Sequence, residues 1–315
     1  MKYTARYFLM AASILFVTAL VITAFYFRSA YRALVLDNED NFPPLVIRII
    51  EKLSRNEPAP EIVPAAEDTI TILEGWNVQD ISRYLEGEGI VSRTDFLNVV
   101  GWPRVDYRNQ KELPALFEFK EDYDFLADKP KHYGLEGYIF PDTYRIYASS
   151  TVLEIMNKVL SNFDNKLTPQ MRDDIKKQGK SIYEIITMAS IIEKEAPINY
   201  QTRDNRDARI ISGIFWNRLD IGQGLQSDAT LSYILDDNKP QHSGAELEVD
   251  SLYNTYKYRG LPPGPICNPG ILAIEAAIYP IETDYYYFLT TLDGSQVYYA
   301  RNYEGHLQNK YKYLK

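Results

Sequence analysis

Residues 181–197 read SIYEIITMASIIEKEAP, and the pattern of this stretch predicts the central helix of the fold. Ser181 is a residue type preferred at helix N-caps. Apolar residues then recur at helical spacing, namely Ile182, Ile185, Ile186, Ala189 and Ile192. Because a proline disfavours helical geometry in the residue before it, Pro197 predicts that the helix ends near Glu195. The stretch therefore predicts a helix with one apolar face and carboxylates in its last turn.

Two glutamates in that last turn are candidates for chemistry. The negative end of the helix dipole and partial burial both raise the pKa of a carboxylate there. A carboxylic acid that stays protonated near neutral pH is suited to act as a general acid in glycosidic cleavage. Glu193 continues the apolar line toward the core, so it needs a partner such as an arginine or backbone amides. Glu195 faces the flank of that line, where a groove could lie; alternatively, both are ordinary surface charges.

The segments around this helix indicate an α+β fold. Thr69–Ile72 alternates as a strand, and a turn at Glu74 and Gly75 leads to a helix from Val78. The remaining predicted elements are helices at Thr151–Phe163 (capped by Ser150 or Thr151), Ala208–Leu219 and Ile271–Ile278, and a β-hairpin formed by Tyr285–Thr290 and Gln296–Ala300. The proline-rich loop Gly260–Gly270 is expected to be a rigid wall or a structural connector.

The N-terminal part predicts a membrane anchor. Tyr7–Phe27 carries no charged residue and is about as long as the ~20 residues that a transmembrane helix needs. Lys2 and Arg6 precede it, which favours a cytoplasmic N-terminus. A cleavable signal peptide is the alternative, but residues 29–33 make a poor cleavage site. We therefore expect a cytoplasmic tip and anchor at residues 1–28, an extracytoplasmic spacer at 29–66, and a single-pass protein of the cytoplasmic membrane whose body lies outside the cytoplasm.

Composition excludes several classes of function. The 315 residues carry a formal net charge of −9, so a polyanion such as nucleic acid is not an expected partner. The single cysteine, Cys267, cannot form an intramolecular disulfide and is expected to be a small apolar core residue. The three histidines are not at the spacing of a zinc-binding helix. We therefore expect neither a metal nor a cofactor.

Several segments, taken together and in order, resemble the endolytic murein transglycosylases, the MltG/YceG-like family. The resemblance covers roughly Thr69 to the C-terminus, plus the anchor. The motifs are LEGYIFPDTY (135–144), ASIIEKE (189–195), NRL (217–219), LQSDAT (225–230), YNTY (253–256) and GLPPGPICNPG (260–270). The chain departs from the family pattern with Ala229 where proline is usual, Leu252 in place of a proline, and Ala196 where the wider lysozyme-like transglycosylases have Ser or Thr.

The resemblance implies a fold and an activity. Residues 67–131 would form a small LysM-like α/β subdomain, and 132–315 a mixed catalytic domain with a lysozyme-like active-site helix and β-hairpins. The enzyme would cleave the bond between N-acetylmuramic acid and N-acetylglucosamine in peptidoglycan strands and leave 1,6-anhydro ends, with Glu195 as acid and base. Expected partners are the glycan strands, together with the penicillin-binding synthases and the elongation machinery.

Supporting residues follow from the same motifs. Asp228 could bind sugar or act as N-cap of a helix that begins near Thr230. Asn254 and Tyr256 could line the groove or finish a turn. Arg218 could partner a buried carboxylate such as Glu193. The full set of candidates for substrate binding is Glu136, Tyr138, Gln226, Ser227, Asp228, Thr230, Asn254 and Tyr256.

Two other functions compete with this interpretation. A muramidase-type hydrolase would use Asp228 or another acid to assist water. A non-catalytic, membrane-tethered scaffold would bind the wall through the LysM-like unit. A serine or cysteine hydrolase is poorly supported, because the chain has no Gly-x-Ser-x-Gly elbow and no histidine near Cys267 in the sequence.

Overall fold

The computed structural model describes residues 67–108, 110–237, 239, 242–291 and 294–314. These residues belong to a unit that runs from Ala65 to Lys315. Its elements are, in chain order, β1 (Glu67–Ile72), α3 (Val78–Gly87), α4 (Arg93–Val100), η2 (Asp124–Leu126), β2 (Asp142–Tyr147), α5 (Val152–Lys166), α6 (Pro169–Lys177), α7 (Ile182–Glu195), α8 (Arg206–Asp220), α9 (Asp228–Leu235), η3 (Glu246–Glu248), α10 (Ile271–Ile278), β3 (Tyr287–Thr290), β4 (Val297–Ala300) and α11 (Tyr303–Tyr313). Helices with small antiparallel sheets confirm the predicted α+β class.

The first sheet joins segments that are far apart in the chain. β1 pairs antiparallel with β2, and Ile70 lies opposite Tyr144. Side chains alternate along both strands, so that one face is buried and the other exposed. β1 belongs to the predicted residues 67–131 and β2 to 132–315, so this sheet crosses the boundary between them. The separate roles of these two parts stay a prediction.

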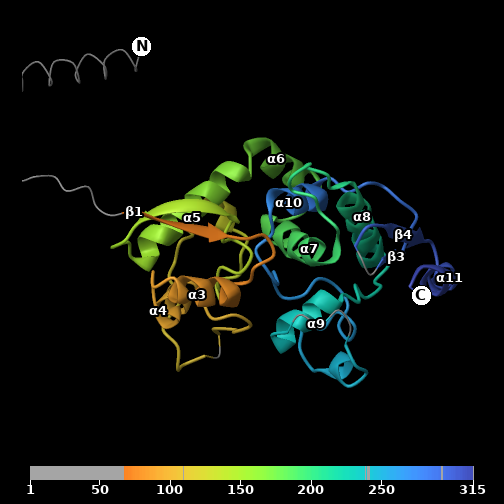
Figure 1. The fold of residues 1–315 in the computed structure, drawn as a ribbon, viewed down its shortest axis with the longest axis horizontal. Helices are drawn as coiled ribbons and strands as arrows, with labels where there is room; N and C mark the ends of the chain where they lie inside the picture. The colour runs from red at the N-terminus through yellow and green to blue at the C-terminus, as the bar shows by residue number, and fades with distance from the viewer. Residues whose placement is uncertain (1–66, 109, 238, 240–241, 292–293, 315) are drawn as a thin grey trace, which may run out of the picture. The chain divides into compact units, whose positions relative to one another are not determined.

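Helix α7 lies at the centre of the C-terminal part (Figure 1). The Ser181 side chain accepts a bond from the Glu184 amide, and the Glu184 side chain bonds back, which completes a capping box. All eight residues from Ile185 to Ile192 are buried, because α7 packs against α6, α8, α9 and α10. The helix ends at Glu195, and Ala196 is extended. The predicted helix and both of its ends are confirmed.

The other predicted elements are confirmed with small changes in their bounds. α5 begins after Thr151, which is its N-cap. α8 is longer than expected at both ends, and α10 has the expected bounds. The predicted hairpin is present as β3 and β4, which pair antiparallel.

The loop Gly260–Gly270 is a buried connector along much of its length. The Asn268 amide donates to Trp76 O, and its Oδ1 accepts from Ile139 N. The Ile266 N–H donates to Ser190 Oγ in α7. Cys267 is free and buried, as expected of a small core residue. Hydrogen bonds from this loop therefore connect α7 to the segment directly before α3.

The predicted membrane anchor, Tyr7–Phe27, lies outside the described residues. Within the part of the chain that the structure describes, no helix is both long and apolar enough to cross a membrane.

Candidate active site

Glu195, the last residue of α7, is a half-buried carboxylate that faces the start of α9. Ser227 Oγ donates to Glu195 Oε1 at 2.5 Å, and the Ala229 N–H donates to the same oxygen at 3.4 Å. Both hydrogen bonds from the described residues thus go to Oε1. The other oxygen, Oε2, is left to carry a proton.

The surroundings raise the pKa of Glu195 above its ordinary value. Burial is the largest cause, because it penalises the charged form. The hydrogen bonds from Ser227 and Ala229 oppose it, the nearby charge of Asp228 adds to it, and the charge of Arg218 lowers the pKa slightly. The net result is a carboxyl group that keeps its proton to higher pH than a solvated glutamate does.

Two helix ends meet at this carboxylate. Ser227 is the N-cap of α9, but its side chain makes no capping bond within that helix, since its hydroxyl donates to Glu195. Glu195 therefore stands at the positive end of the α9 dipole as well as at the negative end of α7. The sequence indicated only the second of these influences.

Thr255, which no sequence pattern singled out, holds the loop before α9. Gln226 is exposed and has a left-handed φ of 51°. Its N–H donates to Thr255 O at 3.2 Å, and the Ser227 N–H donates to Thr255 Oγ1 at 3.0 Å. Thr230 Oγ1 is also 3.0 Å from Thr255 Oγ1. Thr255 lies between the candidate residues Asn254 and Tyr256, and this position in the YNTY motif was the one feature of the sequence that could have pointed to it.

The bond from the Gln226 N–H to Thr255 O, 3.2 Å long, fixes the backbone directly before the N-cap of α9. Left-handed backbone is costly for a residue other than glycine, so it persists only where the surrounding contacts hold it. Here those contacts aim Ser227 Oγ and the Ala229 N–H at Glu195. Ala229 stands where the resembling family usually has proline, and a proline would have no N–H to donate at this position.

Asp228 lies beside the two donors and belongs to a separate polar cluster. Its Oδ1 accepts from Tyr256 OH at 3.2 Å and lies 3.3 Å from Nδ1 of His242. The His242 side chain is buried, and its Nε2 lies 3.3 Å from Asp237 Oδ1. Asp228 is the first residue of α9, so the alternative that it caps the helix is wrong; the N-cap is Ser227. No pattern in the sequence pointed to this position of His242.

Glu193 and Arg218 do not pair with each other. Glu193 Oε2 accepts from Tyr200 OH at 2.5 Å and from the Gly270 N–H at 2.9 Å, so the expected backbone amide partner is confirmed. Burial raises the pKa of Glu193. Arg218 is buried, but it donates to the carbonyls of Tyr286 and Leu225. The expected pairing is wrong because these carbonyls take up the guanidinium. Nothing in the sequence pointed to Tyr200.

Five of the eight predicted binding residues are buried: Ser227 and Thr230 at the start of α9, and Glu136, Tyr138 and Asn254 elsewhere in the fold. Glu136 accepts from the Val78 N–H at 3.0 Å and from Tyr233 OH, and burial raises its pKa to about 8. Tyr138 is 0% exposed and lies among aromatic rings of the core. Asn254 is also 0% exposed and donates to the carbonyls that precede it in its turn. The prediction that these side chains line a cleft is therefore corrected, since each is enclosed by its own structural contacts.

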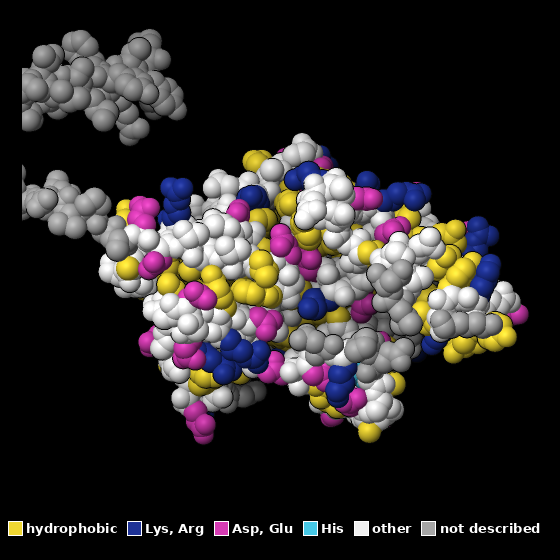
Figure 2. Space-filling view, in the orientation of Figure 1, with side chains coloured by type: hydrophobic (Ala, Val, Ile, Leu, Met, Phe, Trp, Pro, Cys, Tyr) yellow, Lys and Arg dark blue, Asp and Glu magenta, His cyan; other side chains and the backbone are white. Residues whose placement is uncertain are grey.

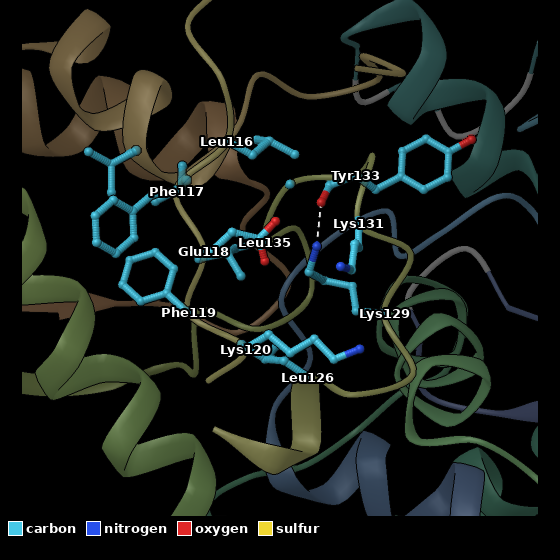
Figure 3. A pocket seen from close by; sticks show the side chains of 13 residues that line it. Leu116, Phe117, Glu118, Phe119, Lys120, Leu126, Lys129, Lys131, Tyr133 and Leu135 are labelled. Atoms are coloured by element: carbon cyan, nitrogen blue, oxygen red, sulfur yellow. Dashed lines mark hydrogen bonds between the residues drawn. The ribbon is translucent and has the colours of Figure 1, made fainter. Parts of the chain in front are cut away.

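A pocket elsewhere in the structure does not involve Glu195. It lies between the end of α4 and residues 116–135 (Figure 3) and is walled largely by apolar side chains. Burial lowers the pKa of Lys129 in this pocket to about 8. Its ammonium already donates to the backbone carbonyls of Pro130 and Tyr133. The Lys129 ammonium therefore has a structural role, because backbone carbonyls accept its hydrogen bonds. Within the described residues, no group of three or more His, Cys, Asp or Glu side chains could hold a metal ion.

The chain is similar to a known family and to named proteins of other bacteria. Residues 33–312 match the model of the YceG-like family. The endolytic murein transglycosylase of Bacillus subtilis (strain 168) is 34% identical over 245 residues, which cover 78% of this chain and 65% of that protein. The endolytic murein transglycosylase of Streptococcus pneumoniae (strain D39) is 31% identical over 274 residues, which cover 84% of this chain and 47% of that protein. The chain thus spans between about half and two thirds of the length of these relatives.

A solved structure supports the same likeness. The crystal structure of a yceG-like protein from Listeria monocytogenes is 31% identical in sequence and has a TM-score of 0.63. The match covers 83% of this chain and 80% of that one.

Proposed function

The chain belongs to the YceG-like family, and we propose that it is an endolytic lytic transglycosylase that cleaves peptidoglycan glycan strands with Glu195 as acid and base. The observation that carries the proposal is the half-buried Glu195, whose pKa is raised and whose Oε2 is left open by its hydrogen bonds. The names of the related proteins support the same reaction.

The first step breaks the glycosidic bond. Protonated Glu195 donates its proton from Oε2 to the oxygen that links C1 of N-acetylmuramic acid to the next N-acetylglucosamine. The C1–O bond breaks, its electron pair stays with the leaving oxygen, and positive charge develops on the muramoyl ring. The Glu195 carboxylate formed in this step stabilises that charge, while Ser227 and Ala229 hold Oε1 in place.

The second step closes a ring. The Glu195 carboxylate takes the proton of the muramoyl C6 hydroxyl as that oxygen bonds to C1. The product is a 1,6-anhydro end, Glu195 regains its proton, and no water is consumed. One carboxyl group that can serve first as acid and then as base is therefore sufficient for the whole reaction.

Residues near Glu195 supply the surface on which the glycan would lie. Gln226 is exposed directly before the N-cap of α9, and Asp228, directly after it, is half-buried together with its hydrogen-bond partner Tyr256. Their amide, hydroxyl and carboxylate groups suit hydrogen bonds to sugar hydroxyls. Ser227 and Thr230 are buried, so they support this surface from beneath.

The location and partners are part of the same proposal. The apolar stretch Tyr7–Phe27 supports a single-pass anchor in the cytoplasmic membrane, with the catalytic domain outside. The motifs of residues 67–131 support a LysM-like subdomain, and those of 132–315 the catalytic domain. Nascent glycan strands made by penicillin-binding synthases are the corresponding substrate.

Replacement of Ser227 by alanine is expected to move the alkaline limb of the pH–rate profile to higher pH. The Ser227 hydroxyl stabilises the charged form of Glu195, so its removal raises the pKa of Glu195 further. A general acid loses activity as pH rises through its pKa, and a higher pKa therefore extends activity upward. The measurement is kcat/KM for glycan cleavage across pH. Ser232→Ala, on the same helix but without contact to Glu195, is the control, and an unchanged limb in Ser227→Ala would contradict the prediction.

Product analysis tests the proposed function. The full chain is incubated with purified glycan strands, and the fragment ends are identified by mass spectrometry. Anhydro ends are the expected result. Reducing ends would mean a muramidase-type hydrolase in which a second acid assists water. No cleavage would favour a wall-binding scaffold.

A further inference from the structure

The far end of α9 is held by a residue outside the predicted catalytic domain. Arg104 Nη1 donates to Tyr233 O at 2.7 Å and to Ile234 O at 2.9 Å. These carbonyls lie in the last turn of α9, where helical carbonyls lack partners within the helix. The Arg104 guanidinium also lies 5.7 Å from the centre of the Tyr233 ring. A cation in this position complements the negative end of the helix dipole.

A second set of contacts fixes the same end. Asp236, the C-cap of α9, has a left-handed φ of 56°. Its Oδ2 accepts from Gln79 Nε2 at 2.8 Å and from Arg83 Nη2 at 2.7 Å, both in α3. Acidic and basic side chains meet over this region in Figure 2. The C-terminal end of α9 is thus attached to residues of the predicted LysM-like part.

The backbone of Arg104 is strained. Its φ is 64°, a conformation that costs free energy for a residue with a Cβ. Such backbone persists where surrounding contacts over-determine it, and here the side chain reaches two carbonyls of a helix that is about 130 residues away in sequence.

Helix α9 is so short that a displacement of its last turn also displaces its first turn. Its eight residues span about 12 Å at 1.5 Å per residue. The first turn supplies the donors to Glu195, and the last turn is held by Arg104. In Figure 1, α9 extends from beneath α7 toward α3 and α4. A shift or fraying of the last turn therefore changes where Ser227 Oγ and the Ala229 N–H lie.

We propose that Arg104 is a positioning residue for the catalytic glutamate, acting through α9 to hold Ser227 Oγ and the Ala229 N–H against Glu195 Oε1. The part of the chain at residues 67–131 thereby contributes to the catalytic centre directly, whether or not it binds glycan. The catalytic half of this inference rests on the proposed function; the link between Arg104 and the Glu195 carboxyl does not.

Replacement of Arg104 by asparagine tests the link with little backbone disturbance, because asparagine tolerates left-handed geometry. In the full chain, we expect kcat for glycan cleavage to fall about tenfold, since small misplacements of catalytic groups are costly. KM should change little, and the alkaline limb of the pH–rate profile should move upward, as in Ser227→Ala. Arg104→Lys, which keeps a cation near the two carbonyls, should restore part of kcat.

Two comparisons separate positioning from a merely structural role. Arg108→Ala removes an exposed arginine of the same segment that pairs with Asp106 and does not contact α9, so it should leave kcat and the pH profile unchanged. In the double variant Arg104→Asn, Ser227→Ala, the decrease in log kcat should be smaller than the sum of the decreases in the two single variants, because both substitutions act on the same carboxylate. Additive decreases in log kcat would count against the inference.

A titration that does not depend on activity completes the test. The Glu195 carboxyl is followed by NMR with ¹³C-labelled glutamate, and assigned by its absence in Glu195→Gln. Arg104→Asn should raise the titration midpoint of Glu195. A lower Tm with unchanged midpoint and unchanged kcat would overturn the inference. If the wild type cleaves no glycan but Arg104→Asn still moves the midpoint, the proposed function fails and the link through α9 stands.

Discussion

Glu195→Gln is expected to lower kcat for the formation of anhydro ends by about 10³-fold or more, in a protein that remains folded. The glutamine oxygen can still accept from Ser227 Oγ and the Ala229 N–H, so the contacts at Oε1 survive. The amide, however, can neither donate a proton to the leaving oxygen nor take one from the C6 hydroxyl. Both steps of the reaction fail together, which explains the size of the expected loss.

The measurement is the yield of anhydro-ended fragments over time, with circular dichroism as the check on folding. Glu193→Gln is the matched comparison, because Glu193 lies two residues away and bonds to Tyr200 and Gly270. It should retain most of the activity. Loss of activity in Glu193→Gln, with activity kept in Glu195→Gln, would move the catalytic role to Glu193.

Gly137→Ala is expected to destabilise the fold by about 2–5 kcal/mol, from left-handed backbone and overpacking combined. Gly137 has a φ of 88°, and an added Cβ would lie 2.5 Å from the Pro265 ring and 2.9 Å from Ile186 Cγ2. Neither neighbour can easily move, because Pro265 is rigid and Ile186 is buried in α7. The predicted fall in Tm is roughly 10 °C for a domain of this size.

Thermal unfolding followed by circular dichroism measures this effect. Gly89→Ala is the matched control, since Gly89 also has a left-handed φ, 70°, but an added Cβ would meet no atom within 4 Å. Its cost should be limited to about 1 kcal/mol of backbone strain. An equal decrease in Tm in the two variants would mean that the clash of the added Cβ with Pro265 adds nothing to the cost of the Gly137 substitution.

Local sequence signals accounted for much of the fold. The cap at Ser181, the apolar spacing after it and Pro197 predicted α7 and both of its ends, because each acts within a few residues. The same holds for the cap of α5 at Thr151 and for the bounds of α10. The pairing of β1 with β2 was not predicted, since about 70 residues separate the two strands.

The candidate site was predicted less completely. Helical periodicity placed Glu193 toward the core and Glu195 on the flank, and the structure gives them different partners accordingly. Periodicity could not tell that Glu136, Tyr138 and Asn254 are enclosed, because their burial comes from segments distant in the chain. The motifs suggested a buried carboxylate such as Glu193 as a partner for Arg218, whereas its guanidinium donates to two backbone carbonyls.

The sequence by itself determined which carboxylates end the central helix and which way each one faces, because helix geometry, capping and proline act over a few residues. Only the tertiary structure decided what meets Glu195: the N-terminus of α9, 32 residues on in the chain, and Thr255 and Arg104 behind it. Hydrogen bonds and desolvation depend on distance in space rather than on spacing along the chain. The chemistry of the carboxyl group therefore depends on how α7 and α9 pack, and no local pattern encodes that contact.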